Sequence, residues 1–132
     1  MDKEDSALQR YFLIALGGAL GSIARFWVGS TIANRFGTKF PYGTFVINIT
    51  ACVIIGFSLT FLAKRTEFSP AWRFLVPIGF VGAYSTFSAY EWETLSTIRS
   101  GAFFLAALYA VGSLIVGLGA VWLGALIAEI LA

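Results

Sequence analysis

The chain has 132 residues, of which 58% are hydrophobic and 12% are charged, and its mean hydropathy is +0.83. Soluble domains carry roughly 25% charged residues, so this composition is typical of a membrane protein and excludes an ordinary soluble domain. The net charge is only +2 and histidine is absent, which argues against a nucleic-acid partner and removes the commonest metal ligand and general base of enzymes. We therefore expect a membrane protein that is not an enzyme.

Four apolar runs predict four transmembrane helices within one domain, residues 1–132. The runs cover residues 11–33, 44–63, 71–98 and 102–131. Each supplies the roughly 20 residues that cross a hydrocarbon core about 30 Å thick. The polar, acidic leader and the lack of a small-residue cleavage site favour a retained first helix, after a short amphipathic lead-in, over a signal peptide. The predicted fold class is an all-α membrane protein.

The first run carries small residues, such as Gly17 and Gly21, spaced four apart, so a neighbouring helix backbone can approach closely. A phosphate-binding loop is disfavoured here because no strand precedes the glycines and no P-loop lysine follows them. Arg25 lies about two-thirds along the run, where a charge costs about 2.5 kcal/mol or more. Two interpretations of Arg25 stay open: with Trp27 it anchors the helix end in the headgroups, or it faces carbonyls or an anion vestibule.

The second run has a stripe of small and polar residues at four-residue spacing, which places them on one slowly rotating face. They are Thr44, Asn48, Cys52, Gly56 and Thr60. Asn48 either bonds a neighbouring helix, a contribution on the order of 1 kcal/mol, or lines a pathway. As the only cysteine, Cys52 excludes a disulfide within the chain.

The third run is too long for a simple span, since about 28 residues of helix would measure roughly 42 Å. Either the helix is tilted with an amphipathic extension, or it is broken near its centre. Pro77, Gly79 and Gly82 weaken helix, and the hydroxyls of Ser85 and Thr86 can satisfy freed backbone groups, so we favour a break between Gly82 and Thr86. Unwound carbonyls at membrane depth are ready cation ligands.

The fourth run places Tyr109 and Ser113 on one face with small residues. Their hydroxyls either bond the carbonyls of the preceding turn or face a polar path.

Positive charges are shared almost evenly between the two ends of the predicted bundle. One end carries Lys3, Arg10, Lys64, Arg65 and Arg73, and the other carries Arg35, Lys39 and Arg99, with Arg25 if it reaches the interface. This weak bias predicts insertion in either orientation. Because four short helices can hardly enclose a pore alone, we expect an antiparallel, two-fold homodimer.

Three motifs occur in order along the chain: G-x-x-x-R at 21–25, P-x-G-T-x-x-x-N at 41–48 and G-F-x-G-x-x-[ST]-T-F-S at 79–88. With these motifs the sequence resembles the small fluoride channels of the Fluc (CrcB) family, over nearly the whole chain after the leader. The resemblance implies a passive, fluoride-selective channel in the lipid bilayer of the bacterial plasma (inner) membrane. It also implies a dual-topology, antiparallel homodimer with two pores and a structural sodium ion (Na+) at its centre.

The resemblance also implies roles for particular residues. The backbone carbonyls of Gly82 and Ser85 would bind the sodium ion, and Arg25 would lie near the vestibule. Phe87 and Tyr90 match the two pore phenylalanines, whose positive ring edges meet the ion. The remaining pore residues are Asn48 at the entry, Glu93, Thr94, Tyr109 and Ser113 in a polar track, and Ser88 as a further donor.

Fluoride is small and strongly hydrated, so its pore needs several weak donors rather than a full charge that would trap it. Hydroxyls, an amide and aromatic ring edges meet this need. Glu93 is the exception, because a carboxylate repels an anion. We expect Glu93 either to accept hydrogen bonds from neighbouring hydroxyls and orient them, or to be protonated when the path is occupied.

Two residues depart from the family pattern. Ala89 stands where Thr or Ser is usual, and Tyr90 replaces the second phenylalanine; either change is expected to lower conduction without abolishing the fold.

Two other functions are compatible with four helices. A small multidrug-type, proton-coupled exporter needs a carboxylate within the first span, which is missing between residues 11 and 33. A non-transporting membrane assembly subunit would use the aromatic and small residues for packing alone.

Overall fold

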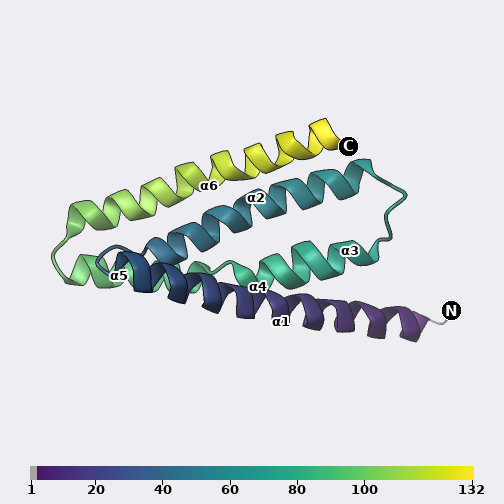
Figure 1. Ribbon diagram of the computed structural model, residues 1–132, viewed down its shortest axis with the longest axis horizontal. Helices are drawn as coiled ribbons and strands as arrows, with labels where there is room; N and C mark the ends of the chain where they lie inside the picture. The colour runs from purple at the N-terminus through teal and green to yellow at the C-terminus, as the bar shows by residue number, and fades with distance from the viewer. Residues whose placement is uncertain (1–2) are drawn as a thin grey trace.

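The computed structural model describes the backbone of residues 3–132, and all of its regular structure in that range is helical. Three long helices dominate: α1 (Lys3–Phe36), α2 (Tyr42–Lys64) and α6 (Phe103–Leu131). Shorter segments connect α2 to α6: α3 (Ala71–Arg73), the π-helical η1 (Phe74–Val81), α4 (Gly82–Tyr84) and α5 (Phe87–Arg99). The helices lie side by side as an elongated bundle (Figure 1).

Among the described residues, three segments are long and apolar enough to cross a membrane: Ser6–Phe36, Tyr42–Lys64 and Phe103–Leu131. They contain most of the predicted first, second and fourth runs. The predicted lead-in is continuous with the first span, because α1 is one helix from Lys3 to Phe36. No proline or glycine interrupts the chain between Lys3 and Leu16, so the polar leader continues the helix.

The third run is divided into several segments. From Ala71 to Tyr84 the backbone is helical, and its π-helical part contains Pro77, whose missing N–H and ring disfavour regular α-helix. Gly82 was expected to leave the helix, yet it keeps helical angles, φ −58° and ψ −32°. Ser85 (φ −72°, ψ 156°) and Thr86 (φ −148°, ψ 107°) instead adopt extended angles between α4 and α5.

Helices α2 and α6 approach so closely that glycine is required at their contacts. A Cβ atom added to Gly56 would overlap the carbonyl oxygen of Val121, and one added to Gly124 would overlap that of Val53. On the other side of the bundle, a Cβ at Gly17 would overlap the Leu75 carbonyl of η1 and lie 2.8 Å from the Phe80 nitrogen. The predicted close packing at the small residues of the first span is therefore confirmed.

The connections gather at the two ends of the bundle (Figure 1). The 65–70 connection lies at the end that carries both termini, and the 37–41 loop and the 100–102 turn lie at the other. The loop and the turn use left-handed glycines, Gly37 (φ 76°) and Gly101 (φ 83°). Large apolar side chains cover the outside, including Phe26 (77% exposed) and Phe104 (83% exposed), as a hydrocarbon solvent requires.

Candidate functional site

The site is built around the extended residues between α4 and α5. The Asn48 side chain, on α2, grips the backbone of Thr86 from both sides: its Nδ2 donates to the Thr86 carbonyl at 3.1 Å, and the Thr86 N–H donates to its Oδ1 at 2.8 Å. This pair of bonds satisfies backbone groups that lie outside a helix, and leaving such groups buried and unpaired is costly. Because the Thr86 N–H can only donate, the orientation of the amide is fixed as well.

Thr86 in turn caps the following helix. Its hydroxyl oxygen accepts from the Ala89 N–H at 3.2 Å, so α5 starts at Phe87 with a capped first turn. In an uninterrupted helix the Thr86 and Ala89 N–H groups would instead donate to the carbonyls of Gly82 and Ser85. These two carbonyls thus lose the helical donors that a continuous chain would supply, and Gly82 is exposed.

Glu93 joins three helices through its carboxylate. Thr44 of α2 donates to one oxygen at 2.6 Å, and Tyr109 of α6 donates to the other at 2.8 Å. Both donors are buried, with Thr44 9% and Tyr109 1% exposed. The expectation that Glu93 accepts bonds from neighbouring hydroxyls is confirmed, and the Tyr109 hydroxyl bonds Glu93 rather than the preceding turn of its own helix.

The two aromatic residues predicted to face the ion lie in different surroundings. Phe87 is 72% exposed on the outside of the chain, whereas Tyr90 is buried at 8%. The Tyr90 hydroxyl donates to the Ala110 carbonyl of α6 at 3.1 Å. Its ring centroid lies 5.7 Å from that of Phe87 and 5.3 Å from that of Tyr109. Tyr90 therefore fixes α5 against α6, a role that its phenolic oxygen makes possible.

The remaining hydroxyls of the predicted site differ in whether they already donate a hydrogen bond to the protein. Thr94 donates to the Tyr90 carbonyl at 2.8 Å within α5. Ser88 is exposed and only a loose 3.5 Å contact joins it to Thr86. The Ser113 oxygen is buried and has no hydrogen-bond partner among the described residues. Ser88 and Ser113 thus remain available as donors.

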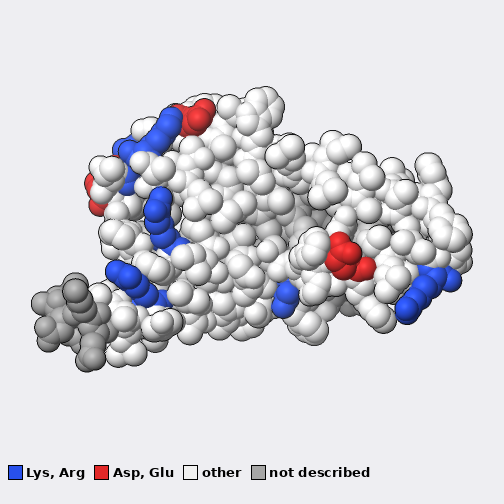
Figure 2. All heavy atoms as spheres, turned by 180° about the vertical axis from the view of Figure 1, so that it is seen from behind, with Lys and Arg blue, Asp and Glu red and all other residues white. Residues whose placement is uncertain are grey.

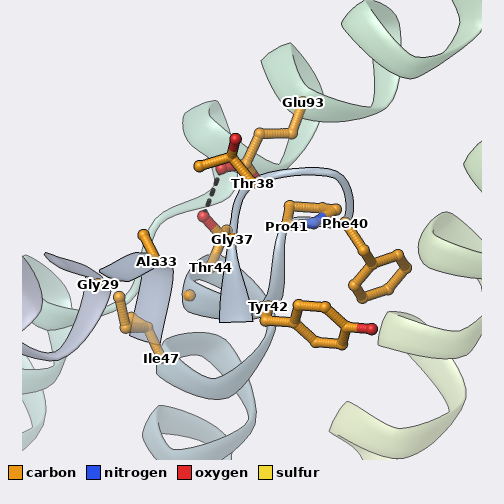
Figure 3. A pocket seen from close by; sticks show the side chains of 11 residues that line it. Gly29, Ala33, Gly37, Thr38, Phe40, Pro41, Tyr42, Thr44, Ile47 and Glu93 are labelled. Atoms are coloured by element: carbon orange, nitrogen blue, oxygen red, sulfur yellow. Dashed lines mark hydrogen bonds between the residues drawn. The ribbon is translucent and has the colours of Figure 1, made fainter. Parts of the chain in front are cut away.

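Two pockets flank Thr44, and their charges are opposite. One, of about 370 Å³, lies under the 37–41 loop, and Glu93 is its only charged lining residue (Figure 3). The other, of about 380 Å³, contains Arg25 and no carboxylate, and it reaches Thr86 and Ala89. Arg25 is half-buried and shares this wall with the hydroxyl residues Ser22 and Ser30. The structure thus brings Arg25 into one pocket with Thr86 of the extended segment, whereas Glu93 lines the other pocket.

Sequence reasoning overlooked two residues of this site. Thr44 was seen only as part of a stripe, and Thr86 only as part of the break. The signal for Thr86 was present, since a threonine directly before an apolar helical segment is a typical N-cap. The partner of Thr44 depends on how α2 and α5 face each other, which no local pattern reports.

Membrane-length apolar helices around a network of hydrogen-bonded polar residues define the class: an integral membrane protein with a polar site between its helices. The family model described as CrcB-like protein, Camphor Resistance (CrcB), matches residues 12–125. The chain belongs to this CrcB-like family.

Curated relatives cover nearly the same length. A protein of Acidobacterium capsulatum is 53% identical over 115 residues, spanning 87% of this chain and 92% of the relative. One of Solibacter usitatus is 45% identical over 120 residues, with 91% and 98% covered, and one of a Synechococcus species is 41% identical over 119 residues, with 90% and 92% covered. All three are named fluoride-specific ion channel FluC.

Proposed function

We propose that this protein is a passive, fluoride-selective channel of a bacterial membrane and not an enzyme. The observation that carries the proposal is its 53% identity, over most of both chains, with a protein named fluoride-specific ion channel FluC. The geometry agrees with this function, because the Asn48 amide, a weak hydrogen-bond donor, holds the extended backbone segment between α4 and α5.

The hydrogen bonds divide the site residues into two groups: those whose donors remain free to bind the ion, and those that position other parts of the site. The Asn48 amide uses one of its two hydrogens on Thr86, so the second remains for an anion. We propose that the Ser88 and Ser113 hydroxyls and the edge of the Phe87 ring bind the ion together with this Asn48 hydrogen. Tyr90, Glu93, Thr94 and Tyr109 are engaged with protein partners and are positioning residues.

Arg25 serves as the entry charge in this proposal. Its pocket has no carboxylate in its lining, whereas the pocket on the other side of Thr44 has Glu93 and no basic side chain. An anion is favoured in the first pocket and repelled from the second. We therefore assign the approach of fluoride to the Arg25 pocket, from which Thr86 and Ala89 lead to the donors.

The path is incomplete in one chain, which supports a homodimer. Phe87 and Ser88 lie on the outer surface of a segment that runs through the membrane, so their donors need a covering partner to exclude lipid. We propose that α3 to α5 form a third span, interrupted at Ser85 and Thr86, and that two copies assemble antiparallel with two pores. The excess of basic residues at one end is small, five against three or four, and this weak bias supports dual topology.

A structural Na+ ion fits the carbonyls left without helical donors. Gly82 and Ser85 would hold it, because backbone oxygens with free lone pairs are the hard ligands that such a cation prefers. The part of the chain that the structure describes has no cluster of His, Cys, Asp or Glu suited to a metal, so carbonyls are the ligands to test. When bound, the ion would supply positive charge beside the extended segment.

Liposomes loaded with fluoride distinguish this function from the two alternatives. A channel gives passive fluoride efflux that an opposing membrane potential stops, and chloride efflux stays at the background rate. A proton-driven exporter gives uptake or release of organic cations that follows a pH gradient, although α1 lacks a carboxylate from Ser6 to Phe36. An assembly subunit gives neither flux. Fluoride retention equal to that of protein-free liposomes would contradict the proposal.

The two departures from the family pattern predict slow conduction. Substitutions toward the family residues should make it faster. Tyr90→Phe removes the bond to Ala110, worth about 1 kcal/mol, and frees the ring to face the ion. Ala89→Thr adds a hydroxyl to the Arg25 pocket. We expect each to raise fluoride efflux severalfold, measured with a fluoride electrode, while Ala107→Thr on the exposed face of α6 changes nothing. Unchanged efflux in both variants would reject the assigned roles of these two positions.

A further inference from the structure

A third pocket, separate from the proposed ion path, lies where α1 meets the start of α3. It has a volume of about 230 Å³ and combines polar and apolar walls. The polar residues are Ser6, Gln9, Arg10 and Ser69, and the apolar ones are Leu13, Pro70, Ala71 and Phe74. Such a division matches the region of a phospholipid where the phosphate joins the glycerol and the acyl chains begin.

Among the described residues that line this pocket, Arg10 is the one charged side chain. Its guanidinium carbon lies 5.2 Å from the centre of the Phe74 ring, so a cation–π contact supports it from one face. Among the described residues the one ion pair is Arg65 with Glu67, at 3.1 Å, so no described acid neutralises Arg10. A guanidinium supported on its face keeps its N–H edge free, which suits the oxygens of a phosphate.

The surroundings of the pocket also favour a membrane anion. This end of the bundle carries Arg10, Lys64, Arg65 and Arg73 together with Glu67 and Glu129, and Figure 2 shows basic and acidic side chains over it between large uncharged areas. Next to Arg10, α1 exposes Tyr11 (72%) and Phe12 (65%), and Trp72 of α3 is 46% exposed. Aromatic residues beside basic ones mark the boundary between headgroups and hydrocarbon.

We propose that this pocket binds the phosphate of an anionic membrane phospholipid, with Arg10 as its principal donor. The Ser69 hydroxyl assists, because its oxygen accepts from the Ala71 N–H at 3.3 Å and its hydrogen remains for the lipid. The glycerol and the start of the acyl chains lie against Leu13 and Phe74. Arg73, which lies between the lining residues Ala71 and Phe74, adds a second positive charge that favours a headgroup with net negative charge.

Native mass spectrometry of the detergent-purified protein with added lipid tests this site. Phosphatidylglycerol should stay bound to the unaltered protein in preference to phosphatidylcholine. Arg10→Gln should reduce phosphatidylglycerol binding about fivefold, the effect of one basic residue near a lipid surface. The matched control is Arg99→Gln, which removes an exposed arginine at the opposite end and should leave binding unchanged.

A second variant keeps the test decisive if Arg10→Gln folds poorly. Phe74→Leu retains an apolar wall but removes the ring beneath the guanidinium, and we expect it to reduce phosphatidylglycerol binding about twofold. Equal lipid binding by the variants and the unaltered protein would overturn the proposal. So would equal retention of phosphatidylcholine, or inorganic phosphate binding that depends on Arg10 in the absence of any lipid binding.

Discussion

Replacing Asn48 by alanine should lower fluoride efflux by at least about tenfold, because leaving the Thr86 N–H and carbonyl unpaired costs about 1–3 kcal/mol each. The segment can avoid this cost only by rewinding into helix. Rewinding would move Phe87 and turn the proposed donors away from the ion path. Efflux from proteoliposomes, at matched protein incorporation, measures the effect. Asn48→Ala also removes the amide hydrogen that we assign to the ion.

Asn34→Ala is the matched control, since Asn34 is exposed near the end of α1 and is not part of the site. We expect its efflux to equal that of the unaltered protein. The thermal unfolding of both variants in detergent separates loss of the path from loss of the fold. An Asn48→Ala protein that conducts at the original rate would contradict the claim that the ion path depends on the Asn48–Thr86 bonds.

Replacing Gly56 by alanine should strongly destabilise the bundle. The added methyl group meets the Val121 carbonyl, and helix backbone cannot move aside as a flexible side chain can. Overpacking of this kind costs about 1–3 kcal/mol, so we expect the unfolding temperature in detergent to fall by at least about 5 °C. Gly124→Ala, which meets the Val53 carbonyl, should have a similar effect.

Gly112 and Gly119 supply the control on the same helix as Gly124. A Cβ atom at either position meets nothing within 4 Å, so alanine there should leave the unfolding temperature within about 2 °C of the original. If Gly112→Ala destabilised the protein as much as Gly56→Ala, glycine content rather than the α2–α6 contact would explain the result.

The sequence predicted the elements that depend on local composition. Apolar runs gave the three long helices, and small residues four apart marked where α1 approaches η1. The acceptor role of Glu93 was also predictable, because a carboxylate in an apolar segment needs donors and hydroxyls were available nearby. These predictions need only periodicity, length and the cost of burying charge.

What the sequence left open depends on how distant segments are rotated against each other. Asn48 had two interpretations, and its partner Thr86 lies 38 residues away on a segment whose backbone is extended. The position of the Tyr90 ring relative to an ion stays a prediction, but its bond to the Ala110 carbonyl, 20 residues away, depends on how α5 faces α6 and no local pattern reports it. Gly82 stayed helical because a glycine permits a break without requiring one, whereas the bonds from Asn48 fix the extended backbone at Thr86.

The most direct test of the proposed function compares fluoride and chloride efflux from proteoliposomes containing the unaltered protein, with Asn48→Ala measured alongside. We expect fluoride to leave the liposomes passively and faster than chloride. Liposomes that contain the Asn48→Ala protein should retain most of their fluoride. Fluoride efflux no faster than from empty liposomes, or chloride efflux as fast as that of fluoride, would contradict a fluoride-selective channel.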